Sequence, residues 1–170
     1  MNNTNVAFRG LFDTNGDCQF GDGDICLVDS KPTKNRICRL YLGKCDIKEN
    51  RWIGLDANSY LPFNDVQSAI RINDIDGFTK LSDCKTMPPF NKIYLVKRYI
   101  KYKQFRFHGI EYVYFIASRL EDFCPSFWYV NSWNIPCELY YDSRFLTIDG
   151  CAVVMIDKDD EFIRLNSRRY

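Results

Sequence analysis

Short apolar runs, each followed closely by a turn signal, recur along this chain at intervals of about ten residues. "VAFRGLF" runs into Asn15-Gly16, "RICRLYLG" closes at Gly43, and "RWIGL" closes at "DANS". This spacing is typical of antiparallel β-sandwiches and barrels. We therefore expect a mainly β protein, either a single antiparallel sandwich or a partly closed barrel with at most one or two short helices. A chain of 170 residues is expected to form one β-rich domain over residues 1–170.

Two hairpins are expected in the C-terminal half. "RFLTI" and "CAVVMI" flank Asp149-Gly150, and Asp-Gly between apolar runs is a strong signal for a two-residue hairpin turn. The polar stretch 157–160, expected to be a solvated loop, and "EFIRL" would extend this hairpin into a three-stranded meander. The second hairpin is expected within residues 92–117, around His108-Gly109.

One short helix and one connector complete the expected organisation. Asn64 is expected to cap a helix over "DVQSAIRI", with Gln67 completing a capping box. The proline pair in "TMPPF" predicts a rigid connector around residues 85–91.

The N-terminal stretch "MNNTNVAFRG" contains no apolar run long enough for a secretory signal. No stretch approaches the roughly 20 apolar residues that span a bilayer. We therefore expect an intracellular, cytoplasmic protein with no membrane span. The eight cysteines are then expected to be mainly reduced core thiols, with disulfides and metal ligation as the alternatives.

A formal net charge of +1 gives no global field that would recruit nucleic acid, but the charges are unevenly distributed. Every charged residue between positions 13 and 29 is acidic, which makes this stretch a candidate interaction patch: Asp13, Asp17, Asp22, Asp24 and Asp29. Asp13, Asn15, Asp17 and Asp24 also have spacing similar to an EF-hand or dockerin-type calcium loop. Cys18 stands where such a loop needs glycine, and Asn15-Gly16 predicts a type I′ turn without a cation. A plain acidic turn is therefore favoured over a calcium site.

The second candidate patch is basic and lies in the central hairpin: Lys97, Arg98, Lys101, Lys103 and Arg106. Aromatic residues alternate with these cations, as they do in proteins that bind single-stranded nucleic acid. An amphipathic strand pair with its cations in water explains the same pattern.

The third candidate patch is aromatic and comprises Phe127, Trp128 and Trp133. Large aromatic side chains are enriched in interface hot spots, but they also fill β-cores. Core packing is the favoured interpretation, with partner binding as the alternative.

Signals for an enzyme are weak. We find no nucleotide-binding loop, no G-x-S-x-G elbow and no C-x-x-C pair, so no cofactor is expected. A thiol-dependent enzyme that pairs one of eight cysteines with His108, the single histidine, stays formally open.

The sequence therefore favours a non-enzymatic structural or protein-interaction protein. Its acidic and basic patches could join copies of the chain, or the chain and other assembly components, in an oligomer. Composition and β content suit a viral capsid or virion component. Nucleic-acid binding through residues 92–117 is the alternative, and a thiol-dependent enzyme is the second alternative.

Overall fold

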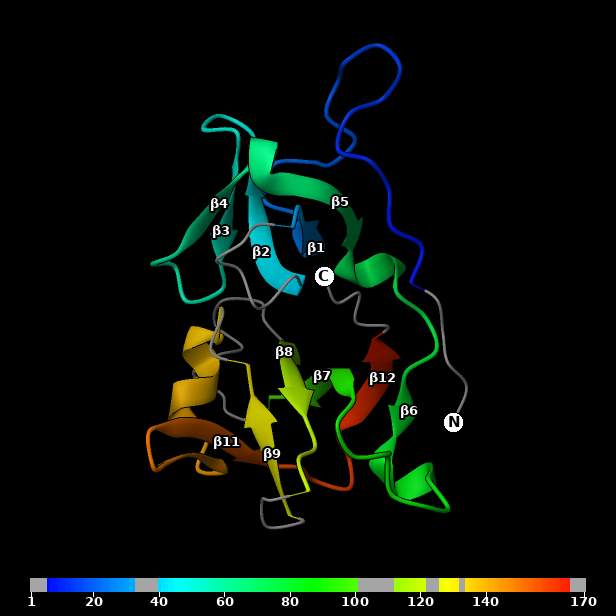
Figure 1. Cartoon of the computed structure of the whole chain (residues 1–170), viewed down its shortest axis with the longest axis vertical. Coiled ribbons are helices and arrows are strands. Elements are labelled where there is room, and N and C mark those ends of the chain that lie inside the picture. The colour runs from blue at the N-terminus through cyan, green and yellow to red at the C-terminus, as the bar shows by residue number, and fades with distance from the viewer. Residues whose placement is uncertain (1–5, 33–39, 101–111, 122–125, 132–133, 166–170) are drawn as a thin grey trace.

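The computed structural model describes residues 6–32, 40–100, 112–121, 126–131 and 134–165 (Figure 1). These residues form two antiparallel sheets and four short 3-10 helices, so the expected mainly β fold is confirmed. Neither sheet closes into a barrel, and the arrangement is that of a sandwich. In Figure 1 the five-stranded sheet occupies the upper half of the molecule and the seven-stranded sheet the lower half.

The five-stranded sheet has the strand order β4-β3-β2-β1-β5. Its strands are β1 (Ile25–Ser30), β2 (Leu40–Asp46), β3 (Arg51–Gly54), β4 (Tyr60–Pro62) and β5 (Val66–Arg71). Two 3-10 helices flank β5, namely η1 (Phe63–Asp65) and η2 (Ile72–Asp74).

The predicted helix that begins at Asn64 is wrong, because most of its residues form strand β5. Leu27 of β1 pairs with Ile70, and Val28 pairs with Ala69. The burial of Val66, Ala69 and Ile70 fits either a short helix or a strand. Pairing with β1 decides between the two, because it bonds the backbone of β5 along most of its length.

The seven-stranded sheet has the strand order β10-β11-β9-β8-β7-β12-β6. Its strands are β6 (Thr79–Lys80), β7 (Ile93–Tyr99), β8 (Tyr112–Ser118), β9 (Phe127–Val130), β10 (Phe145–Ile148), β11 (Cys151–Met155) and β12 (Glu161–Leu165). The 3-10 helix η3 (Leu81–Asp83) follows β6, and η4 (Cys137–Tyr141) precedes β10.

Both predicted strand pairs are present, whereas the predicted meander is wrong in part. β7 pairs with β8 along seven residues, and β10 pairs with β11 across Asp149-Gly150, where both residues have positive φ. β12 does not continue this hairpin. It lies between β7 and β6 instead.

Three apolar clusters alternate with the two sheets. The central cluster joins the sheets, and it combines Leu27 and Leu42 with Leu95, Ile116 and Ile163. On the far side of the five-stranded sheet a second cluster surrounds Trp52, and on the far side of the seven-stranded sheet a third surrounds Trp128. Much of each sheet is therefore buried on both faces, which explains why its strands read as near-continuous apolar runs.

The predicted connector, residues 85–91, joins η3 to β7, and both belong to the seven-stranded half. The Pro88 carbonyl accepts a hydrogen bond from Arg119, and the Pro89 carbonyl accepts one from the Tyr94 hydroxyl. The chain passes from one sheet to the other earlier, between β5 and β6.

Candidate functional site

The first part of the acidic stretch is a self-contained turn. Asp13 Oδ1 accepts hydrogen bonds from the backbone N–H groups of Asn15 and Asp17, each at 2.9 Å. Phe12 and Cys18 form a bridge, the Asp13 N–H donates to the Asp17 carbonyl, and residues 14–16 form the three-residue loop between Asp13 and Asp17. Gly16 has positive φ and Asn15 does not, so the expected type I′ turn is replaced by a three-residue hairpin loop.

Asp22, Asp24 and Asp29 of the stretch are also used within the chain. Asp22 Oδ1 accepts a hydrogen bond from the Ile47 backbone N–H, and Asp29 is buried in β1. Asp24 Oδ2 lies 2.8 Å from Arg71 Nε, and it also accepts the Gly21 N–H. Asp24 is therefore committed to an ion pair rather than to a calcium loop, and Asp29 does not belong to an exposed patch. In the described part of the chain no group of three or more His, Cys, Asp or Glu side chains could hold a metal ion.

A small cavity of about 110 Å³ lies beside this ion pair. Its walls include Arg9, Arg71 and Asp74, with the Arg71 guanidinium 5.2 Å from the centroid of the Phe20 ring. Asp24 and Asp74 formally balance the two arginines, so the cavity has no net charge that would select an anion.

Arg98 of the basic patch is buried and is the centre of an ion-pair network. Its Nε and Nη2 atoms donate to the two carboxylate oxygens of Asp160 at 2.9 and 2.7 Å. Its Nη1 atom lies 3.3 Å from Asp142 Oδ2. Arg98 is 2% exposed and therefore does not belong to an exposed patch, and Asp160 is equally buried rather than part of a solvated loop.

Lys97 is partly exposed, and its ammonium nitrogen lies 4.4 Å from the centroid of the Tyr112 ring. Lys101, Lys103, Arg106 and His108 lie outside the described residues. Nucleic-acid binding by residues 92–117 therefore stays a prediction.

The aromatic patch divides between the two faces of β9. Trp128 is fully buried in the third cluster, where its ring packs against Tyr94 and Phe162. The favoured core interpretation is thus confirmed for Trp128. Phe127 lies on the opposite face of β9 and is partly exposed, whereas Trp133 lies outside the described residues.

The face of the seven-stranded sheet that carries Phe127 is the candidate functional site. On β7, β8 and β12 the same face packs against the five-stranded sheet through the central cluster, but β9, β11 and β10 extend beyond that cluster. On this face, the side chains that lie opposite one another across the three strands are apolar. We call it the outer face, and it comprises Phe127, Tyr129, Leu146, Ile148, Cys151, Val153 and Met155.

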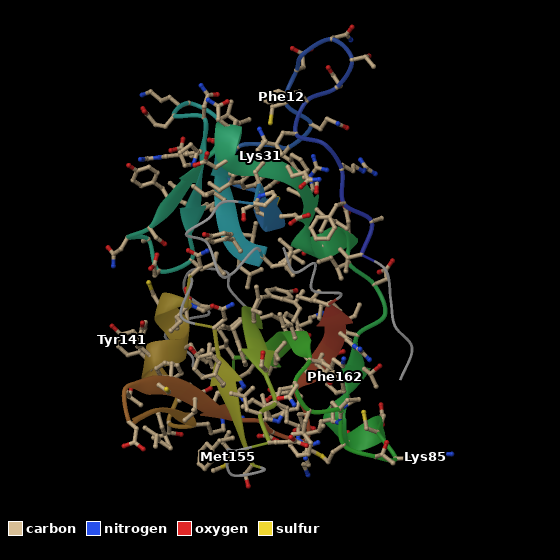
Figure 2. All side chains as sticks on the ribbon, in the orientation of Figure 1. Phe12, Lys31, Lys85, Tyr141, Met155 and Phe162 are labelled. Atoms are coloured by element: carbon tan, nitrogen blue, oxygen red, sulfur yellow. The ribbon has the colours of Figure 1, made fainter. Side chains whose placement is uncertain are left out.

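Exposure of the outer face is concentrated on the edge strand β10 and at the C-terminal end of β11. Leu146, Ile148 and Met155 are 41%, 38% and 41% exposed, whereas Val153 at the centre is fully buried. Met155 lies at the periphery of the molecule in Figure 2, while Phe162 of β12 lies inside it. Sequence reasoning found only Phe127 of this face. The missed signal is that "FLTI" and "CAVVM" carry no charge at any position, on either face of the hairpin.

Three of the four sheet edges are protected in ways that natural proteins use against strand pairing. β4 has three residues and ends in Pro62, and β6 has two residues. Along β5, the backbones of Arg9 and Ala69 exchange two hydrogen bonds of 2.8 Å. β10 has four uncharged residues without proline, and among the described strands none pairs with its outer edge.

The six cysteines within the described ranges are free thiols. Burial, together with the neighbouring Cys18 and Asp24, raises the pKa of the Cys45 thiol to about 12. Burial also raises the pKa of Cys26, Cys84 and Cys137. A nucleophilic cysteine needs a lowered pKa, so these four thiols are poor candidates for catalysis.

No helix among the described residues is long and apolar enough to cross a membrane. No protein-family model, curated protein or solved structure matches the chain.

Proposed function

We propose that this chain is a non-enzymatic interaction protein that binds a protein partner through the outer face of β9, β11 and β10. The observation that supports the proposal is the extension of this apolar face beyond the central cluster, with Leu146, Ile148 and Met155 each more than a third exposed. Contiguous exposed apolar surface at a sheet edge is a common mark of a protein interface.

A second exposed aromatic surface lies beside β10, on the opposite face of the sheet, because Phe145 packs against the third cluster. Tyr140 and Tyr141 of η4 are 59% and 68% exposed, and the Tyr140 ring packs edge-to-face on Phe145 at 5.2 Å between centroids. Tyrosine combines a large apolar ring with a polar hydroxyl and is enriched at interface hot spots. Figure 2 shows Tyr141 at the margin of the molecule, on the same side as β11.

Charge complementarity contributes less than the sequence suggested. Asp24 and Arg98 already form ion pairs inside the chain, and Asp29 is buried. Asp13, Asp17 and Asp22 are exposed and Lys97 is partly exposed, so these residues remain available for steering a partner. A capsid or virion role and an intracellular location both stay predictions.

Site-specific photo-cross-linking in the producing cell tests the proposal. A photoreactive phenylalanine analogue replaces Leu146 in one variant, Met155 in a second, and exposed Lys85 of the η3–β7 connector in a control. We expect one discrete cross-linked protein species from positions 146 and 155 and none from position 85. Adding Ile148→Lys to the first two variants is expected to abolish it, because an ammonium group would be desolvated in the interface.

Folded variants that give no cross-linked species at either position would overturn the proposal. Cross-linking that survives Ile148→Lys would place the interface elsewhere and would overturn it too.

A further inference from the structure

We infer that the partner is a second copy of this chain, and that the two copies pair their β10 strands antiparallel across a twofold axis perpendicular to the sheet. This inference rests on the proposed function and specifies its partner. It would join two seven-stranded sheets into one continuous sheet, with the two outer faces adjoining on the same side.

The hydrogen bonds of β10 show which backbone groups face its open edge. The Met155 N–H donates to the Arg144 carbonyl, and the Phe145 N–H donates to Asp142 rather than to β11. Because backbone direction alternates along an antiparallel strand, Leu146 and Ile148 bond to β11. Thr147 therefore directs both its N–H and its C=O away from β11, toward the open edge.

This pattern selects one register for self-pairing. A twofold axis perpendicular to the sheet keeps the outer faces of both copies on one side. Two residues can therefore lie opposite each other only if their side chains are on the same face, that is, if their numbers are both odd or both even. If Thr147 lies on the axis, it faces Thr147 of the second copy, and the two residues exchange reciprocal N–H to C=O bonds. Shifting the axis to Leu146 would need the Phe145 N–H, which is already bonded to Asp142.

The side chains fit this register on both faces of the sheet. Leu146 of each copy lies opposite Ile148 of the other on the outer face, so the two most exposed residues of β10 on that face cover each other. Thr147 faces Thr147, a cross-strand pair that is favourable in antiparallel sheets. No charged residue of β10 is brought against a like charge, because the strand has none.

A second copy is favoured over a foreign strand because β10 is complementary to itself in hydrogen bonds and in side chains. A twofold contact also closes after two copies, since it consumes both open edges. The protected edges β4, β5 and β6 leave the described part of the chain with no competing site for the same kind of pairing.

Sedimentation velocity of the purified protein over a wide concentration range tests the inference. We expect a dimer that dissociates on dilution. Thr147→Pro removes the outward N–H without touching the β10–β11 hydrogen bonds, and proline is tolerated at such edge positions. It should weaken dimerisation by roughly tenfold or more. If this variant does not fold, Thr147→Lys serves instead, because it sets two like charges opposite each other. Tyr60→Lys in the edge strand β4 is the matched control and should dimerise like the unchanged chain.

The outcomes separate this inference from the proposed function. A purified protein that stays monomeric at all concentrations, but cross-links to another protein through position 146, would overturn self-pairing and leave the proposed function intact. A dimer that persists in folded Thr147→Pro or Thr147→Lys would overturn pairing through β10. Dimers lost in the Thr147 variant and kept in Tyr60→Lys would support it.

Discussion

Arg98 of β7 and Asp160, which precedes β12, form a bidentate ion pair with N–O distances of 2.9 and 2.7 Å, and each side chain is 3% exposed. The pair ties neighbouring strands to the loop after β11, where Arg98 Nη2 also donates to the Met155 carbonyl. Arg144 extends the network by bridging Asp142 and Asp157. Every partner of Arg98 comes from a distant part of the chain, so this side chain connects elements rather than meeting solvent.

Arg98→Met should lower the free energy of unfolding by about 3–5 kcal/mol, because it leaves the buried Asp160 carboxylate without its counter-charge. Urea denaturation followed by tryptophan fluorescence measures the loss. Lys92→Met, at an exposed position just before β7, should change stability by less than about 0.5 kcal/mol. Equal effects of the two substitutions would show that the network contributes nothing.

Asp142 should make the protein sensitive to acid. Burial raises the pKa of Asp142, but hydrogen bonds from Arg144 and the charge of Arg98 outweigh burial and hold it below its ordinary value. A carboxyl whose pKa is lowered on folding contributes stability that is present above its unfolded pKa of about 3.9 and is lost as pH falls through the folded value. The difference in unfolding free energy between the unchanged chain and Asp142→Asn should therefore shrink from about pH 5 to about pH 2. A difference that stays constant over this range would contradict the ion-pairing role.

Gly54→Ala should destabilise the contact between β3 and the loop before η4. A Cβ at Gly54 would meet the side chains of Asn134 and Ser59, which are joined by a hydrogen bond of 2.7 Å. Asn134 is buried and has positive φ, so its side chain cannot easily move away from the added Cβ. Overpacking of this kind costs about 1–3 kcal/mol.

Gly10→Ala is the matched control for that substitution, because its added Cβ would have no neighbour nearer than 4.0 Å. Thermal unfolding of both variants compares them directly. A Gly54→Ala protein as stable as Gly10→Ala would show that the contact with Asn134 does not constrain the fold.

Cys26 and Cys45 should resist alkylation in the native protein. Both are at most 2% exposed, and burial raises the pKa of Cys45 to about 12, so the reactive thiolate is scarce near pH 8. Mass spectrometry after a timed iodoacetamide pulse should find both residues labelled only when the protein is unfolded. Rapid, selective labelling of either in the folded protein would revive the thiol-enzyme hypothesis.

The local parts of the fold were predictable from sequence. The Asp149-Gly150 turn depends on two adjacent residues, whose positive φ values suit a tight hairpin, and it was predicted correctly. The segment from Val66 to Arg71 was not, because a short apolar run fits both helix and strand until its pairing with β1 is known.

Long-range relationships were beyond local reasoning. Arg98 and Asp160 are 62 positions apart, and no sequence signal joins them. Their burial removed one residue from the predicted basic patch and one from the predicted solvated loop. The outer face escaped notice for a similar reason, since it forms only where β11 pairs with β9, which is not its neighbour in the sequence.

The position of β12 between β7 and β6 has a consequence for biosynthesis. While the chain is being made, the edge of β7 that pairs with β12 stays unpaired until residues 161–165 leave the ribosome. During that interval Arg98 also lacks its Asp160 partner, and Ile163 has not yet joined the central cluster. The seven-stranded sheet can therefore be completed only after residues 161–165 have emerged, and until then the nascent chain exposes two unpaired strand edges, at β7 and β10, rather than one.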